Sequence, residues 1–294
     1  MAIPFTVIGG FLGAGKTTLL NRLLRATTGR RFAVLVNDFG ALDIDGALVQ
    51  RHDGDTIALA NGCLCCTIGD SLVTTLFALL DRPQGFDHFV VEASGVADPG
   101  KIADLGALEP RLSRDGVVVV VDAATVQERA ADRRLADTVE RQLAAADLLV
   151  LNKLDLVPDP APLREWLAGR SAAPVLDARH ADVPIHLLFG LDEIGEAGDG
   201  EAAHGFASWS YQFHSAVDRE VVRRLLKRAD ILRAKGILRF ADTPLRLTVL
   251  QQVGARIEFA DGGPWDGRPS RLVLLGVKPM LSSLPGEATA WRPG

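Results

Sequence analysis

The segment Gly10–Thr17 limits the fold of this chain more than any other stretch of the sequence. It reads Gly-Phe-Leu-Gly-Ala-Gly-Lys-Thr and matches the pattern G-x-x-x-x-G-K-[ST] in full. A short apolar run, Phe5–Ile8, precedes it, and leucines at helical spacing follow it. A strand, a glycine-rich loop and a helix in this order are the setting in which the pattern binds nucleoside triphosphates. The sequence therefore predicts an α/β fold with a parallel P-loop sheet and flanking helices.

The residues of this loop have separate expected roles. Lys16 should reach the β- and γ-phosphates as a catalytic residue, and the Thr17 hydroxyl should ligate Mg²⁺. Backbone N–H groups should surround the phosphates, because glycines let the chain approach them closely. The predicted nucleotide-binding residues of the loop are Gly10, Gly13, Ala14, Gly15, Lys16, Thr17 and Thr18.

Two other predicted strands end in an acidic residue. Asp38 follows the apolar run 32–36 after one asparagine, and Glu92 directly ends the apolar run 89–91. The carboxyl ends of strands in an open α/β sheet face the ligand crevice, so both carboxylates are predicted to lie near the phosphates. Gly95 follows Glu92 closely and, having no side chain, can turn its backbone N–H towards a γ-phosphate. We therefore expect Asp38, Glu92 and Gly95 to belong to the catalytic site.

The tetrad Asn152-Lys153-Leu154-Asp155 follows another predicted strand, over 147–151. Asp155 can accept hydrogen bonds from N1–H and N2–H₂ of guanine, and Asn152 can bond the edge of the base. The aliphatic stem of Lys153 can lie over the ring. Adenine does not offer this pair of donors, so the tetrad predicts GTP rather than ATP.

The three cysteines of the chain, Cys63, Cys65 and Cys66, all lie in one short segment. Thiolates this close in sequence suit a transition metal such as Zn²⁺ or Co²⁺, and they also suit redox chemistry. A structural zinc knuckle would need a second Cys or His pair at ligand spacing, which the sequence lacks. We therefore expect an open metal site, with Asp38 as a candidate oxygen ligand of this metal or a member of the Mg²⁺ shell. The alternative is that the three cysteines bind no metal and act only as small hydrophobic residues in a buried turn.

The sequence predicts two domains. Residues 1–190 carry the P-loop and the cysteines, and the apolar pattern within them predicts one long helix over about 126–145. Residues 191–205 are polar and rich in glycine, which is typical of a linker. Residues 206–294 show alternating strands around one helix and predict a smaller α+β domain.

Composition excludes some partners. A formal net charge of -5 provides no basic field, so nucleic acid is not an expected partner. The most apolar run, Val117–Val121, is too short to span a bilayer, and we expect no membrane partner. The opening residues lack the basic start and apolar core of a signal peptide. Clustered thiols also fit a reducing compartment, so we expect a cytoplasmic protein.

Taken together, the P-loop, the segments around Asp38, Glu92 and the cysteines, and the Asn-Lys-Leu-Asp tetrad resemble the CobW-type family of GTPases. The resemblance covers residues 4 to about 180 and continues into the segment 233–238 of the second domain. It implies slow GTP hydrolysis with Mg²⁺ and delivery of Zn²⁺ or Co²⁺ to a client metalloenzyme or metal-insertion machinery. The family's metal-binding motif falls on the three cysteines, and its frequent Glu is replaced here by the shorter Asp38.

Two functions of other classes stay open. The first is a small-molecule kinase whose second domain holds the acceptor, and the second is a non-hydrolysing, GTP-dependent binding protein for a metalloenzyme client. The sequence identifies neither the metal nor the client, and it leaves a homodimer open.

Overall fold

A computed structural model describes residues 2–25, 30–38, 56–62, 68–83, 85–189, 206–228, 230–277 and 289–290. The chain divides into two compact units, Met1–Ile185 and His186–Gly294. The linker predicted over 191–205 lies outside the described residues, so its bounds stay a prediction. Within the described ranges, no helix combines the length and the apolar character needed to cross a membrane.

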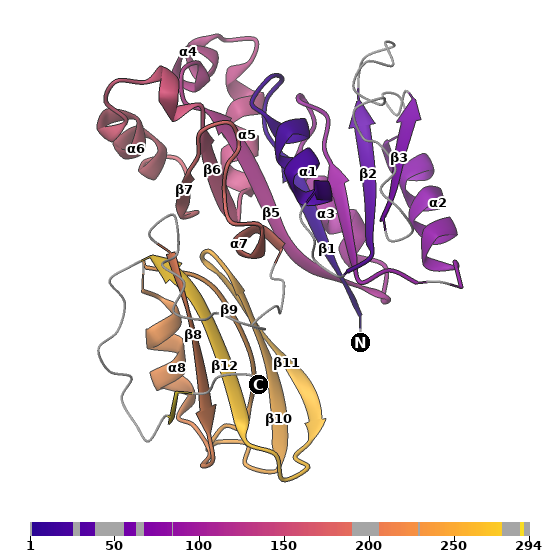
Figure 1. The fold of residues 1–294 in the computed structure, drawn as a ribbon, viewed down its shortest axis with the longest axis vertical. Coiled ribbons are helices and arrows are strands. Elements are labelled where there is room, and N and C mark those ends of the chain that lie inside the picture. The colour runs from indigo at the N-terminus through magenta and orange to yellow at the C-terminus, as the bar shows by residue number, and fades with distance from the viewer. Residues whose placement is uncertain are drawn as a thin grey trace. The chain divides into compact units, whose positions relative to one another are not determined.

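The first unit is built on a seven-stranded sheet in the order β3-β2-β4-β1-β5-β6-β7 (Figure 1). Every neighbouring pair of its strands is parallel, which confirms the predicted sheet type. The P-loop strand β1 lies at the centre of the sheet. Strands β2, β3 and β4 lie on one side of it, and β5, β6 and β7 lie on the other side. The strands are β1 (Ile3–Gly9), β2 (Phe32–Asp38), β3 (Thr56–Gly62), β4 (His88–Glu92), β5 (Leu112–Asp122), β6 (Leu148–Asn152) and β7 (Val175–Asp177).

Helices cover the sheet because alternate residues of each strand point to opposite faces. One apolar core joins Val7, Val91 and Val119 to leucines and isoleucine of helices α2, α3, α5 and α6. Helix α1 covers the other face and buries Leu19, Leu20 and Leu23. The helices are α1 (Lys16–Arg25), α2 (Ile68–Leu80), α3 (Pro99–Ala107), α4 (Val126–Ala131), α5 (Ala136–Ala145) and α6 (Ala161–Ala168), and α7 (Ile185–Phe189) follows at the boundary between the two units.

The prediction of one long helix over 126–145 is wrong, because the segment forms α4 and α5 with a turn between them. Asp132 ends α4 in an extended conformation, with ψ at 115°. Its carboxylate accepts from the backbone N–H of Arg134 at 2.9 Å and from the guanidinium of the same residue. These hydrogen bonds lower the pKa of Asp132 to about 2. A side chain that bonds the backbone locally competes with helix continuation, which explains the break.

The second unit contains a six-stranded antiparallel sheet in the order β11-β10-β9-β12-β8-β13. Helix α8 (Arg219–Leu226) packs on it through Val222, Leu225 and Leu226, against residues such as Leu250 and Leu272. This arrangement confirms the predicted α+β class. The strands are β8 (Phe206–Phe213), β9 (Ile231–Leu238), β10 (Arg246–Val253), β11 (Arg256–Pro264), β12 (Ser270–Val277) and β13 (Thr289–Ala290).

Candidate functional site

The P-loop connects the end of β1 to the first turn of α1. Gly10, Gly13 and Gly15 have φ angles of 129°, 74° and 109°, which other residues rarely adopt. Helix α1 begins at Lys16 and has no acidic residue in its first turn. The helix N-terminus therefore presents backbone N–H groups and the positive end of its dipole without a competing carboxylate. Such an end suits an anionic phosphate.

Lys16 and Thr17 lie in the first turn of α1, directly after the P-loop glycines. Lys16 is only 7% exposed, and its ammonium donates to the carbonyl oxygens of Gly10 at 2.9 Å and Phe11 at 3.3 Å. The Thr17 hydroxyl donates to Glu92 Oε1 at 3.2 Å, so β4 and the P-loop meet at a hydroxyl–carboxylate pair. Oxygen donors of this kind are the ligands that Mg²⁺ prefers, and the pair fits a Mg²⁺ shell. The neighbouring Thr18 is exposed on α1.

Asn152 ties three parts of the site together. It ends β6 and is 2% exposed. Its amide nitrogen donates to the carbonyl of Ala14 in the P-loop at 2.9 Å. Its amide oxygen accepts from the N–H of Ala181, beyond β7, at 2.7 Å. The predicted base-binding strand end and the phosphate loop are therefore joined directly, as one site requires.

The rest of the tetrad forms a tight turn. Lys153 has a left-handed backbone with φ at 63°, and its ammonium lies 2.8 Å from Asp122 Oδ2. Asp122 ends β5, is 4% exposed, and also accepts from the N–H of Ala124. Asp155 follows in a single 3₁₀ turn and is exposed, so its carboxylate is accessible to a base. Asp122 carries no recognisable sequence motif, although it ends an apolar strand in the same way as Glu92.

Gly95 lies directly against the tip of the P-loop. A Cβ built on it would stand 2.6 Å from the Leu12 side chain and 2.7 Å from the Leu12 backbone nitrogen. Gln142 of α5 reaches this loop, and its amide nitrogen donates to the Gly95 carbonyl at 3.1 Å. A lone glutamine on a helix carries no motif, so the sequence offered no signal for it.

The predicted metal site falls largely outside the described residues. Cys63, Cys65 and Cys66 are among the residues left undescribed, as is the side chain of Asp38. The backbone shows that Asp38, at the end of β2, is aligned with Gly62, at the end of β3 and next to Cys63 in sequence. Among the side chains that the structure describes, no group of three or more His, Cys, Asp or Glu could hold a metal ion. The cysteine ligands and the role of Asp38 therefore stay predictions.

Comparisons with known proteins place this geometry in a family. Residues 4–173 match "CobW/HypB/UreG, nucleotide-binding domain", and residues 206–283 match "Cobalamin synthesis protein cobW C-terminal domain". The chain is 32% identical to "Zinc chaperone CobW" of Sinorhizobium sp, over 95% of this chain and 94% of that protein. It is 34% identical to "Zinc chaperone YjiA" of Escherichia coli (strain K12), over 96% of this chain and 88% of the relative.

A solved structure shows a similar fold. The crystal structure of Zn(II)-bound YjiA GTPase from E. coli matches with a TM-score of 0.50 and 27% identity. The match covers 95% of each chain and therefore extends over both units.

Proposed function

The chain belongs to the CobW/HypB/UreG family, and on that premise we propose that it is a GTP-hydrolysing metallochaperone. It binds a transition metal, with Zn²⁺ as the first candidate, at Cys63, Cys65 and Cys66. It uses the GTP cycle to transfer the metal to a client metalloenzyme. The names of the relatives, which are zinc chaperones, support zinc over cobalt as the cargo.

The observation that carries the nucleotide part is the junction at Asn152. One buried side chain bonds both the P-loop at Ala14 and the loop after β7 at Ala181. The exposed Asp155 follows it in the chain and supplies the carboxylate that guanine N1–H and N2–H₂ require. The phosphate-binding and base-binding segments are thus held together, which supports GTP as the ligand.

The residues at the phosphate end support hydrolysis. Lys16 supplies the cation opposite the β- and γ-phosphates, and Thr17 with Glu92 would hold Mg²⁺, which neutralises phosphate charge when bound. Leu12 and Val96, which flank Gly95, are exposed apolar side chains, 50% and 43% accessible. Neither of these two side chains, among the residues that the structure describes, can orient an attacking water, which supports slow GTP turnover.

The alignment of Asp38 with Gly62 supports the metal part. It brings a candidate oxygen ligand to the strand end that leads into the cysteines. Helix α2 begins at Ile68, just after them, and the positive end of its dipole favours thiolates. The strand between β2 and β1 is β4, which carries Glu92. Metal and nucleotide therefore bind at ends of neighbouring strands, where coupling between them must be reciprocal.

The guanine assignment can be tested with Asp155→Asn. Asparagine presents an N–H donor where one carboxylate oxygen accepted. The N2–H₂ group of guanine therefore loses its acceptor, whereas xanthine, which has an oxygen at C2, gains a donor. A polar group left mispaired once the bound base covers it costs about 1–3 kcal/mol, so GTP affinity should fall roughly tenfold or more. XTP affinity should rise over the same range. Affinities measured by titration of fluorescent nucleotide analogues would show the exchange.

Lys16→Ala is the companion variant for hydrolysis. Loss of the cation should reduce GTP turnover by at least about a hundredfold, the effect of removing one preorganised transition-state contact. Unchanged GTP preference in Asp155→Asn, or parental turnover in Lys16→Ala, would contradict the proposal. Phosphate transfer to a small-molecule acceptor would instead favour a kinase.

A further inference from the structure

Gln142 is a buried polar side chain of α5 with two bonds to one loop. It is 3% exposed, and its amide nitrogen donates to the carbonyl oxygens of Gly95 and Ala97, each at 3.1 Å. Both acceptors belong to the segment that follows β4 and Glu92. Because burial strengthens a satisfied hydrogen bond and makes a lost one costly, these two bonds fix that segment on α5.

The loop fixed by Gln142 lies in contact with the P-loop. The hypothetical Cβ of Gly95 would clash with both the side chain and the backbone nitrogen of Leu12, so only glycine allows this approach. The carbonyl that Gln142 holds belongs to the peptide after Gly95, whereas the N–H of Gly95 belongs to the peptide before it. The hydrogen bond from Gln142 therefore holds the peptide after Gly95. The N–H of Gly95 stays able to turn towards the P-loop.

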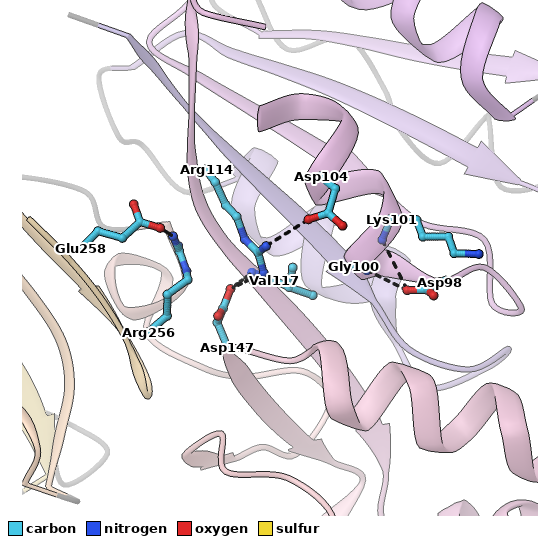
Figure 2. Close-up of polar contacts among 9 residues, drawn as sticks. All are labelled: Asp98, Gly100, Lys101, Asp104, Arg114, Val117, Asp147, Arg256 and Glu258. Atoms are coloured by element: carbon cyan, nitrogen blue, oxygen red, sulfur yellow. Dashed lines mark hydrogen bonds and ion pairs between the residues drawn. The ribbon is translucent and has the colours of Figure 1, made fainter. Parts of the chain in front are cut away.

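The same loop is secured further downstream. Asp98 caps α3, accepting from the backbone N–H of Gly100 at 3.0 Å and of Lys101 at 3.4 Å (Figure 2). Between Gly95 and α3, the backbone is thus held by Gln142 at the carbonyls of Gly95 and Ala97 and by the Asp98 cap at the start of α3. A shift of Gly95 relative to the P-loop would have to break the bonds of Gln142 first.

The α4–α5 segment also holds the other side of this contact. Arg129 of α4 donates to the carbonyl of Leu12 at 3.1 Å, and its guanidinium lies 4.7 Å from the centre of the Phe11 ring. Arg129, Phe11 and Gln142 line one small pocket together with residues of β5. Two neighbouring helices therefore position both the P-loop tip and the Gly95 loop.

We propose that Gln142 is a positioning residue for GTP, which holds Gly95 against the P-loop tip so that its N–H meets the γ-phosphate. This inference rests on the proposed function, since it assigns a role towards GTP. It predicts that Gln142 matters for the γ-phosphate and not for the rest of the nucleotide. GDP, which lacks that phosphate, should bind independently of Gln142.

The test compares GTP and GDP in the variant Gln142→Met, which keeps the side-chain length but has no donor. Affinity for a non-hydrolysable GTP analogue with Mg²⁺ should fall about tenfold, the effect of one to two lost buried hydrogen bonds. Affinity for GDP should stay within about twofold, and kcat for GTP should fall as well. GDP binding also reports that the variant is folded. Gln142→Asn, whose amide is too short to reach the loop, should give the same selective loss.

Gln252 supplies a matched control in the second unit. It is 2% exposed, and its amide nitrogen also donates to two backbone carbonyls, those of Leu226 at 2.7 Å and Gly254 at 2.9 Å. Gln252→Met should lower thermal stability without changing the ratio of the two nucleotide affinities. An unchanged ratio in both Gln142 variants, or tighter binding of the GTP analogue, would overturn the role of Gln142 alone. Failure of the unmodified chain to bind GTP would overturn the proposed function as well.

Discussion

Single side chains hold the nucleotide site together by bonding backbone groups. Asn152 bonds Ala14 and Ala181, Lys16 bonds the carbonyls of Gly10 and Phe11, and Gln142 bonds the loop at Gly95. A buried donor or acceptor left without its partner costs about 1–3 kcal/mol. Small changes at these positions should therefore alter nucleotide binding without unfolding the sheet.

Gly15→Ala should disrupt the junction between the P-loop and the base-binding strand. The added Cβ would stand 2.4 Å from the Asn152 amide nitrogen, on a backbone whose φ of 109° already disfavours a side chain. Asn152 must then move, and its bond to Ala14 is lost. We expect GTP affinity to fall roughly tenfold or more, measured by calorimetric titration.

Gly267→Ala is the control for Gly15→Ala, because it introduces backbone strain without a steric clash. Gly267 has a φ of 91°, and a Cβ there would meet nothing within 4 Å. Strain alone should cost about 1–2 kcal/mol of stability and leave GTP affinity unchanged. Equal affinities for GTP in Gly15→Ala and in the parent would show that Asn152 does not organise the site.

Residues of a spaced motif can be identified from the sequence, whereas the distant partners of a lone polar residue such as Asp122 or Gln142 cannot. The pattern of the P-loop predicts the roles of Lys16 and Thr17, which the structure places in the first turn of α1. Asp122 and Gln142 hold Lys153 and Gly95 from elements far away in the chain. Only the packing of β5 and α5 on the site reveals them.

At the scale of elements, the break between α4 and α5 shows the limit of periodicity. Val139 and Leu143 keep the apolar spacing of the predicted helix and are buried. The turn depends on Asp132, whose carboxylate caps Arg134 in competition with the helix. A hydrophobic pattern reports which face is buried, but it does not report a polar side chain that interrupts the backbone bonds.

Helix α3 offers a prediction at this scale, because its start lies just after the Gly95 loop. Asp98→Ala removes the N-cap bonds to Gly100 and Lys101. The free energy of unfolding of the first unit should fall by about 1 kcal/mol, the typical value of such a cap. Thermal or denaturant unfolding, recorded with and without GDP and Mg²⁺, would measure it, and bound nucleotide should counteract the loss.

Asp218→Ala is the control in the second unit. Asp218 caps α8 in the same way, accepting from the N–H of Glu220 at 2.8 Å and of Val221 at 3.0 Å. A similar loss of stability is expected there, but one that nucleotide does not counteract. If GDP restored both variants equally, the two units would not unfold separately.

At the scale of the whole molecule, sheet order brings distant segments of the chain to one edge. The P-loop follows β1, and Glu92, Asp122 and Asn152 are the last residues of β4, β5 and β6. These four strands are neighbours in the sheet. The ends of β2 and β3 continue this edge towards Cys63. The sequence predicted the fold class because the P-loop lies between an apolar strand and a helix, whereas the roles of the residues at the strand ends stay predictions. The cysteines lie outside the described residues, and no spacing rule predicts from the sequence which of them would share one metal ion.

The affinity for Zn²⁺ in the two nucleotide states tests the central claim most directly. A chromophoric chelator would compete for Zn²⁺ with the chain loaded with Mg²⁺ and either a non-hydrolysable GTP analogue or GDP. We predict tighter Zn²⁺ binding in the GTP state by about 5- to 150-fold, the usual range of coupling between sites. We also predict that changing Cys63, Cys65 and Cys66 together to Ser abolishes it. Equal Zn²⁺ affinity in both states, or Zn²⁺ binding that survives the loss of all three thiols, would contradict the account.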